Sequence, residues 1–125
     1  MLIPHGMLVM IADSHAWRLL RNAGTEAVPV LVAQDTPALA VAHHAGGHGG
    51  AHATEAGHAA AIADWLAREV TAHRLDNLVL IAPPRLLGEL RHHLNPAVAR
   101  IVRHTLAKDL IGRHEAEILA VLRGE

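Results

Sequence analysis

Apolar positions in this chain form short unbroken runs and helical spacings, and the second half holds the clearest example of both. Leu78–Ala82 is an unbroken apolar run, too short for a helix, which predicts a strand buried on both faces. Pro84 suits the first position of a following helix, where a backbone N–H would make no bond. Leu87, Leu90 and Leu94 then recur at helical spacing until an Asn-Pro pair ends the pattern. The segment therefore predicts a strand that leads directly into an amphipathic helix.

The first third of the chain predicts three more strands. Met7–Ala12 is apolar, and Ala16–Arg21 alternates loosely between apolar and polar residues. Asn22–Gly24 has the composition of a turn. Val28–Ala33 is rich in β-branched residues, and Pro29 near its start favours the edge of a sheet.

The remaining elements predict a mixed sheet covered by helices. One helix before the buried strand has an apolar stripe formed by Ile62, Trp65, Leu66 and Val70. Ala97–Arg100 predicts a helical turn, Ile101–Leu106 a strand and Glu115–Arg123 a final helix. The order is β-β-β-loop-α-β-α-β-α, which over 125 residues predicts a single α/β domain.

The composition changes sharply between the third strand and the first helix. His43–His58 contains five His, five Gly and four Ala, with Thr54 and Glu55 as its only other residues. Because closely spaced glycines oppose a stable helix, we expect a mobile loop over this range. Thr54 then suits the N-cap of the next helix, with Glu55 complementing its macrodipole.

The composition also bears on where the protein acts. The chain has no Cys, which excludes disulfides and thiolate metal ligands. Met1–Ala12 is apolar but lacks the basic start of a signal peptide. No run approaches the roughly 18 apolar residues that a membrane span needs. We therefore expect a soluble cytoplasmic protein that does not bind membranes.

Positive charge is concentrated in one segment of the chain. Residues 85–113 carry six cationic and two acidic side chains, although the whole chain has a formal charge of −1. The cationic residues are Arg85, Arg91, Arg100, Arg103, Lys108 and Arg113. Such a segment either faces nucleic acid or forms an ordinary solvated surface, and both interpretations stay open.

Three groups of residues carry a family resemblance. They are Val9–Asp13, the block Leu78–Arg85 with Leu87–Arg91, and Lys108–Leu110. In combination they resemble the bacterial host attachment protein family over nearly the whole chain. That family is similar to the middle domain of archaeo-eukaryotic release factors and of Pelota, so the resemblance implies a ribonuclease-H-like mixed sheet.

The resemblance also points to a functional loop. In those release factors a Gly-Gly-Gln loop reaches the ribosomal peptidyl-transferase centre, and the corresponding residues here are Gly46, Gly47 and His48. Histidine offers one ring donor and one acceptor, whereas glutamine offers an amide and a carbonyl. The resemblance therefore implies association with RNA or the ribosome, without autonomous catalysis.

A metal site is an alternative use of the same loop. His44, His48 and His52 recur every four residues, and neutral imidazoles bind Zn or Ni well. A glycine-rich loop, however, lacks the rigid frame of a specific site. The competing interpretation is a linker that chelates metal adventitiously, and we expect no resident cofactor.

Enzymatic chemistry finds weaker support. A hydrolase would use His48 or His15 as its base, and His15 lies beside Asp13 in a predicted turn. A two-metal nuclease needs carboxylates on its central strand, and Leu78–Ala82 supplies none. His92, His93 and His104 are expected on the surface.

Arg85 is the leading candidate for binding an anion. It follows the central strand at a predicted helix start, where backbone N–H groups and the helix dipole favour negative charge. Arg91, Arg103 and Lys108 are expected to extend this surface toward RNA. The alternative is an ion pair between Arg85 and Glu89, four residues on. We also expect exposed sheet edges that allow a homodimer.

Overall fold

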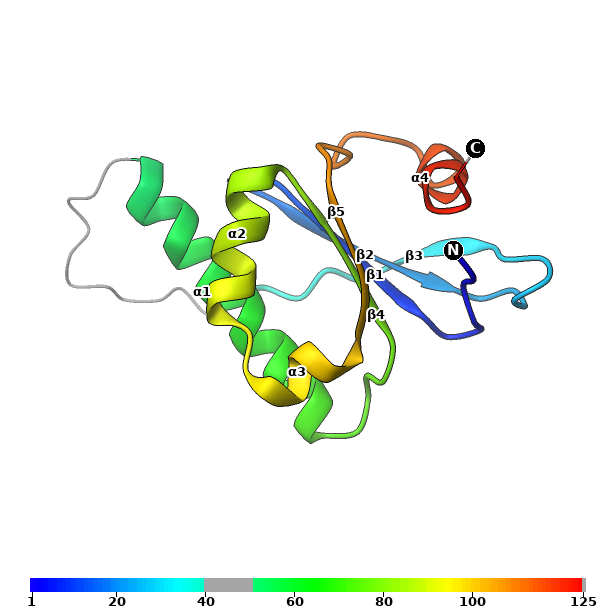
Figure 1. Cartoon of the computed structure of the whole chain (residues 1–125), viewed down its shortest axis with the longest axis horizontal. Coiled ribbons are helices and arrows are strands. Elements are labelled where there is room, and N and C mark those ends of the chain that lie inside the picture. Colours follow the sequence, from blue (N-terminus) through cyan, green and yellow to red (C-terminus); the bar gives the residue numbers. More distant parts are fainter. Residues whose placement is uncertain (40–50, 125) are drawn as a thin grey trace.

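The computed structural model describes residues 1–39 and 51–124, and side chains throughout these ranges except at 51–54. In these ranges the chain forms a five-stranded sheet with helices on both faces (Figure 1). The elements are β1 (Leu8–Ala12), β2 (Trp17–Asn22), β3 (Leu31–Gln34), α1 (Ala51–Thr71), β4 (Leu78–Ala82), α2 (Pro84–His93), α3 (Pro96–Ile101), β5 (Val102–Ala107) and α4 (Glu115–Leu122). This order confirms the predicted mixed α/β class, and the predicted helical turn is α3.

The sheet has the strand order β3-β2-β1-β4-β5. The β1–β2 and β2–β3 pairs are antiparallel, whereas β4 runs parallel to both β1 and β5. A register shift between Leu78 and Val79 interrupts the β4–β5 ladder near its start. Consequently β1, β4 and β5 all end at the same edge of the sheet, which we call the carboxyl edge.

Alternating side chains of the central strands divide the core into two clusters. Leu8 and Met10 of β1 pack in the cluster beneath α1, α2 and α3, whereas Val9 and Ile11 pack in the cluster beneath α4. Figure 1 shows these helices on opposite faces of the sheet. Every residue of β4 is buried, as the unbroken run Leu78–Ala82 predicted.

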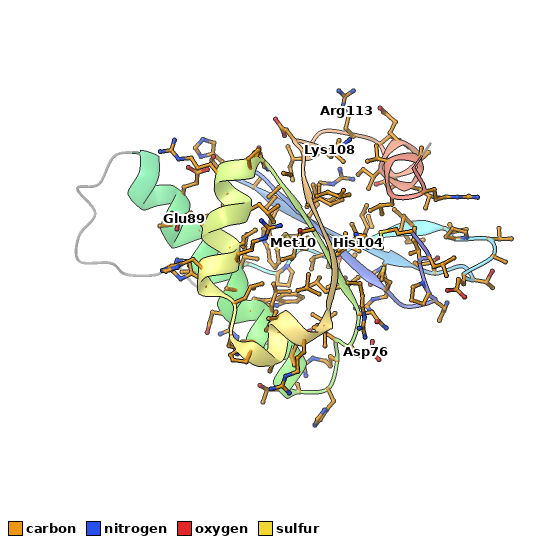
Figure 2. The ribbon with its side chains drawn as sticks, in the orientation of Figure 1. Met10, Asp76, Glu89, His104, Lys108 and Arg113 are labelled. Atoms are coloured by element: carbon orange, nitrogen blue, oxygen red, sulfur yellow. The ribbon has the colours of Figure 1, made fainter. Side chains whose placement is uncertain are left out.

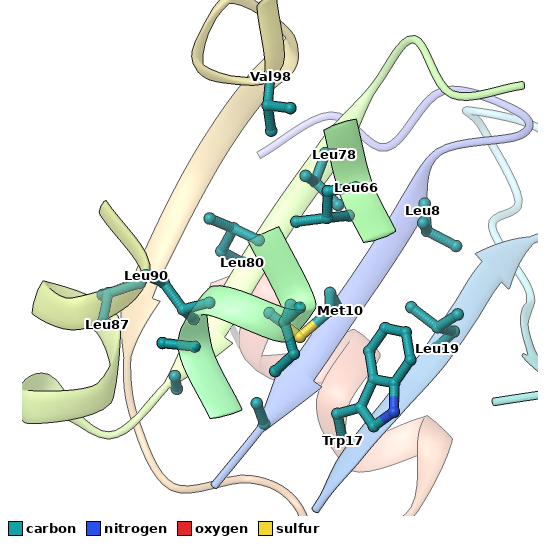
Figure 3. Close-up of a cluster of buried hydrophobic side chains, with 14 of the residues drawn as sticks. Leu8, Met10, Trp17, Leu19, Leu66, Leu78, Leu80, Leu87, Leu90 and Val98 are labelled. Atoms are coloured by element: carbon teal, nitrogen blue, oxygen red, sulfur yellow. The ribbon is translucent and has the colours of Figure 1, made fainter. Parts of the chain in front are cut away.

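The two tryptophans meet inside the larger cluster. The rings of Trp17 and Trp65 lie edge to face, with centroids 5.2 Å apart. Figure 3 shows Trp17 beside the sheet residues Met10 and Leu19. In a core with so few aromatic side chains, this pair supplies large buried area and a preferred ring geometry.

The predicted loop over His43–His58 is wrong in its second half. Residues 51–58 belong to α1, which begins at Ala51 rather than after an N-cap at Thr54. The alanines in this segment favour helix strongly enough to outweigh Gly57, which costs about 1 kcal/mol. Glu55 therefore lies in the second turn of α1, and residues 43–50 of the predicted loop fall outside the described residues.

The third strand begins later than predicted, because its first residues form a turn. Val28 and Val30 bond to residues at the end of β2 and just beyond it. The Thr25 N–H donates to the Val28 carbonyl, and the Val30 N–H donates to Oδ1 of Asn22, the last residue of β2. A side chain at Gly24 would collide with the Val28 carbonyl, so this turn requires glycine. As Pro29 predicted, β3 lies at the edge of the sheet.

Among the helices of the described residues, none combines the length and apolar character required to cross a bilayer.

Candidate functional site

The carboxyl edge brings together segments that lie far apart in the sequence. Asp13 follows β1, Arg85 opens α2 directly after β4, and Lys108 follows β5. Ala82 of β4 pairs with Ala107 of β5, so the residues that follow these two strands leave the sheet side by side. Figure 2 places Lys108 at the end of the molecule where α2 begins. Ligands of open α/β sheets bind most often outside such an edge.

The turn after β1 is shaped by the Asp13 carboxylate. Asp13 Oδ1 accepts hydrogen bonds from the backbone N–H groups of His15 at 2.9 Å and Ala16 at 2.7 Å. The Asp13 N–H donates in turn to the Ala16 carbonyl at 3.0 Å. The carboxylate thus bonds to the His15 backbone, which supports a structural turn rather than an acid/base pair.

Glu55, on α1, contacts both this turn and the start of α2. Its side chain is only 8% exposed, although it carries a carboxylate. Ser14 Oγ donates to Glu55 Oε1 at 3.2 Å, and Arg85 Nε lies 3.7 Å from Glu55 Oε2. A buried carboxylate needs such partners to offset its lost hydration. Glu55 therefore ties α1 to the β1–β2 turn and to the start of α2.

Arg85 occupies the predicted position at the start of α2, and its ion-pair partner differs from the one in the alternative interpretation. Pro83 is the N-cap, and no side chain in the described part of the structure donates or accepts a capping hydrogen bond there. The Arg85 side chain is 56% exposed and forms an ion pair with Glu55. Glu89, the partner in that alternative, has an oxygen 3.8 Å from His93 Nε2. The buried carboxylate holds this arginine at the carboxyl edge while its side chain remains open to solvent.

His58 adds a second connection between α1 and the hairpin. It follows Glu55 by three residues, and its Nε2 lies 3.2 Å from the Ala16 carbonyl oxygen. This is a hydrogen bond when Nε2 carries the proton. Glu55 and His58 together hold the start of α1 against the β1–β2 turn.

The other predicted cations do not share one surface. Arg91 donates to the hydroxyl of Thr105 on β5, and Arg103 Nε donates to Asn77 Oδ1 at 2.7 Å. Arg103 lies at the start of β5, so about 16 Å of strand separates it from Lys108. The fold therefore brings Arg85 and Lys108 to the carboxyl edge. It places Arg103 at the other end of the sheet, where β5 begins.

The segment between Lys108 and α4 is anchored by Arg18 of β2. Arg18 Nη1 donates to the carbonyls of Ile111 at 2.9 Å and Arg113 at 2.8 Å. Its Nη2 donates to Glu115 Oε1 at 3.0 Å. One guanidinium thus fixes the route of the chain from the carboxyl edge to the opposite face of the sheet.

The predicted loop and metal residues fall mostly outside the part of the chain that the structure describes. They are Gly46, Gly47, His44 and His48, together with the side chain of His52. Within the described residues, no group of three or more His, Cys, Asp or Glu side chains is arranged to hold a metal ion. The loop functions and the metal hypothesis remain predictions.

The three histidines His92, His93 and His104 lie on the surface as predicted. The rings of His92 and His93 contact each other with centroids 5.5 Å apart, at the end of α2. His104 is exposed on β5.

The Ser14–Glu55–Arg85 connection is the main feature that the sequence did not predict. Its members are separated by 41 and 30 positions, and no local spacing relates them. The one available signal was Glu55 itself, the single acidic residue in the His/Gly/Ala-rich stretch.

Comparison with known proteins identifies a family. The family model described as "Protein required for attachment to host cells" matches residues 8–122. No curated protein matches the chain.

Proposed function

The chain belongs to the family of proteins required for attachment to host cells, and we propose that it is a cytoplasmic binding module without catalysis of its own. Its partner is a phosphate-bearing polymer, RNA, and the site is the carboxyl edge around Arg85 and Lys108.

One observation carries this proposal. A buried glutamate on α1 positions Arg85 at the edge where three parallel strands end, and Lys108 leaves the neighbouring strand there. Arginine donors match phosphate oxygens, and the start of α2 adds the favourable end of a helix dipole. A cation restrained by an ion pair at this edge loses less side-chain entropy on binding a phosphate than an unrestrained side chain would.

The fold supports RNA as the partner through the resemblance to release factors and Pelota. A ribonuclease-H-like topology is part of this proposal. The strand order β3-β2-β1-β4-β5 is consistent with it. So are the strand directions: β1, β2 and β3 are antiparallel to one another in turn, whereas β4 is parallel to both β1 and β5. In the release factors this domain acts at the ribosome, so ribosomal RNA is the first RNA to test.

Binding of a short single-stranded RNA at about 50 mM salt, measured by fluorescence anisotropy, tests the proposal. Arg85→Ala and Lys108→Ala should each weaken binding several-fold. Each should also reduce the slope of log affinity against log salt by about 0.7, because one phosphate contact is lost.

Arg103→Ala is the matched control, since it removes the same charge from an exposed residue at the start of β5, the end of the strand away from the carboxyl edge. Its affinity and salt slope should stay close to those of the unaltered protein. The proposal fails if the unaltered protein does not bind RNA at low salt, or if Arg103→Ala weakens binding as much as Arg85→Ala.

A further inference from the structure

An exposed apolar stripe runs along the edge strand β3 and the turn residues that precede it. Val28, Val30 and Val32 are 69%, 49% and 42% exposed, and they account for three of the four exposed large hydrophobic residues in the described chain. Leu31 packs beneath α4, so Val32, its neighbour, points to the opposite face of the sheet. In Figure 1 this cyan strand lies away from α2 and α3.

The backbone of β3 offers hydrogen-bonding groups to another strand. The Asn22 N–H donates to the Met7 carbonyl on the β1 side, and the alternation of antiparallel ladders therefore makes Arg21 bond to Val32 on the β3 side. The N–H and C=O groups of Leu31 and Ala33 consequently point away from β2. An edge of this kind is a template for a further strand.

The two edges of the sheet differ in how well they resist pairing. The β5 edge carries Arg103 and a register shift near its start, and Lys108 follows its end. Charges and irregular ladders are the usual means of protecting an edge. Leu31–Gln34 contains no charged residue.

We infer that β3 pairs antiparallel with β3 of a second copy of this chain, with Val32 on the twofold axis. Leu31 of each copy then forms hydrogen-bonded pairs with Ala33 of the other. The two Val32 side chains meet in a non-hydrogen-bonded pair, and each Val30 faces Gln34. The result is a continuous sheet across two molecules.

Charge and symmetry favour a second copy over another protein. In this register Asp35 faces Pro29, and the dimer lacks the one hydrogen bond that the missing Pro29 N–H would donate. No charged residue faces another of the same sign. Pairing β3 with itself closes a twofold dimer, whereas pairing β3 with β5 would build an open chain of molecules and would place two cations at the contact.

Single cysteine variants test this register, because the chain has no other Cys. In Val32→Cys the two Cα atoms would lie about 4.5 Å apart, within the range that a disulfide spans. Mild oxidation should therefore convert Val32→Cys to a covalent dimer. Val30→Cys, at a similarly exposed position, should not cross-link, since its two copies would lie about 13 Å apart.

Sedimentation of the unaltered full chain provides the second measurement. It should show a dimer at high micromolar concentration, and Val32→Lys should convert it to a monomer by placing two ammonium groups on the axis. His104→Lys, on the exposed β5 edge, should leave the dimer intact. A monomeric unaltered protein overturns the inference, as does equal cross-linking of Val30→Cys and Val32→Cys.

Discussion

Asn22 holds together the corner where the N-terminal segment meets the β2–β3 turn. It is fully buried, and its Nδ2 lies within hydrogen-bond distance of the carbonyls of Ile3, Pro4 and Thr25. Its Oδ1 accepts from the N–H groups of Gly24 and Val30, both at 2.9 Å. A single amide thus satisfies backbone groups from two segments. The sequence marked this asparagine only as part of a turn.

Replacing this amide should be costly. Asn22→Ala leaves buried N–H and C=O groups without partners, so we expect a loss of at least about 2 kcal/mol in the free energy of unfolding. Asn22→Asp keeps the acceptor and loses the donor, and should unfold before the unaltered protein in urea. Asn77→Ala, at a half-buried position, is the control and should cost below about 1 kcal/mol. A loss for Asn22→Ala no greater than this control would contradict the role given to the amide.

Among the elements, α4 is held by a polar anchor as well as by its buried side chains. Figure 1 shows it alone on its face of the sheet, and Ile118 and Leu122 are its buried residues. Arg18 and Glu115 add the ion pair that fixes its start. A hydrogen bond from its own backbone N–H lowers the pKa of Glu115 most. The charges of His114 and Arg18 lower it further, and together these effects outweigh partial burial, which raises it.

This lowered pKa predicts a loss of stability in acid. A carboxyl group whose pKa is lower in the folded state stabilises the fold above its ordinary pKa, and this contribution disappears as the pH falls through the folded value. Glu115→Gln should therefore be less stable than the unaltered protein at neutral pH. The difference in urea midpoint should close as the pH falls below the ordinary range of a glutamate. A difference that is the same at both pH values would contradict the stabilising role given to the Glu115 carboxylate.

At the scale of the whole molecule, the residues that were predicted well are those whose environment follows from local pattern. Leu78–Ala82 is apolar throughout because helices cover both faces of β4, and no other arrangement suits such a short run. Pro84 was placed correctly at the start of α2, because the first helical position needs no backbone N–H donor. These local rules sufficed for the element order and for the place of Arg85.

The errors have physical causes as well. The composition of His43–His58 concealed the start of a helix at Ala51, from which point the alanines favour helix. Glu55 was interpreted through its own helix, whereas its partners come from the β1–β2 turn and α2. Arg103 was grouped with Lys108 because the two are close in sequence, but they lie at opposite ends of β5. Contacts set by packing between distant elements leave no spacing in the sequence.

We propose that the carboxyl edge is the binding site. Titration of the isotope-labelled protein with a short single-stranded RNA at low salt, followed through its backbone amide NMR signals, tests this claim most directly. We predict that the largest shifts fall on Asp13–Ala16, Arg85 and Lys108, while Asn77 and Arg103 stay nearly unchanged. Shifts centred on Asn77 and Arg103, or no shifts at any RNA concentration, would contradict it.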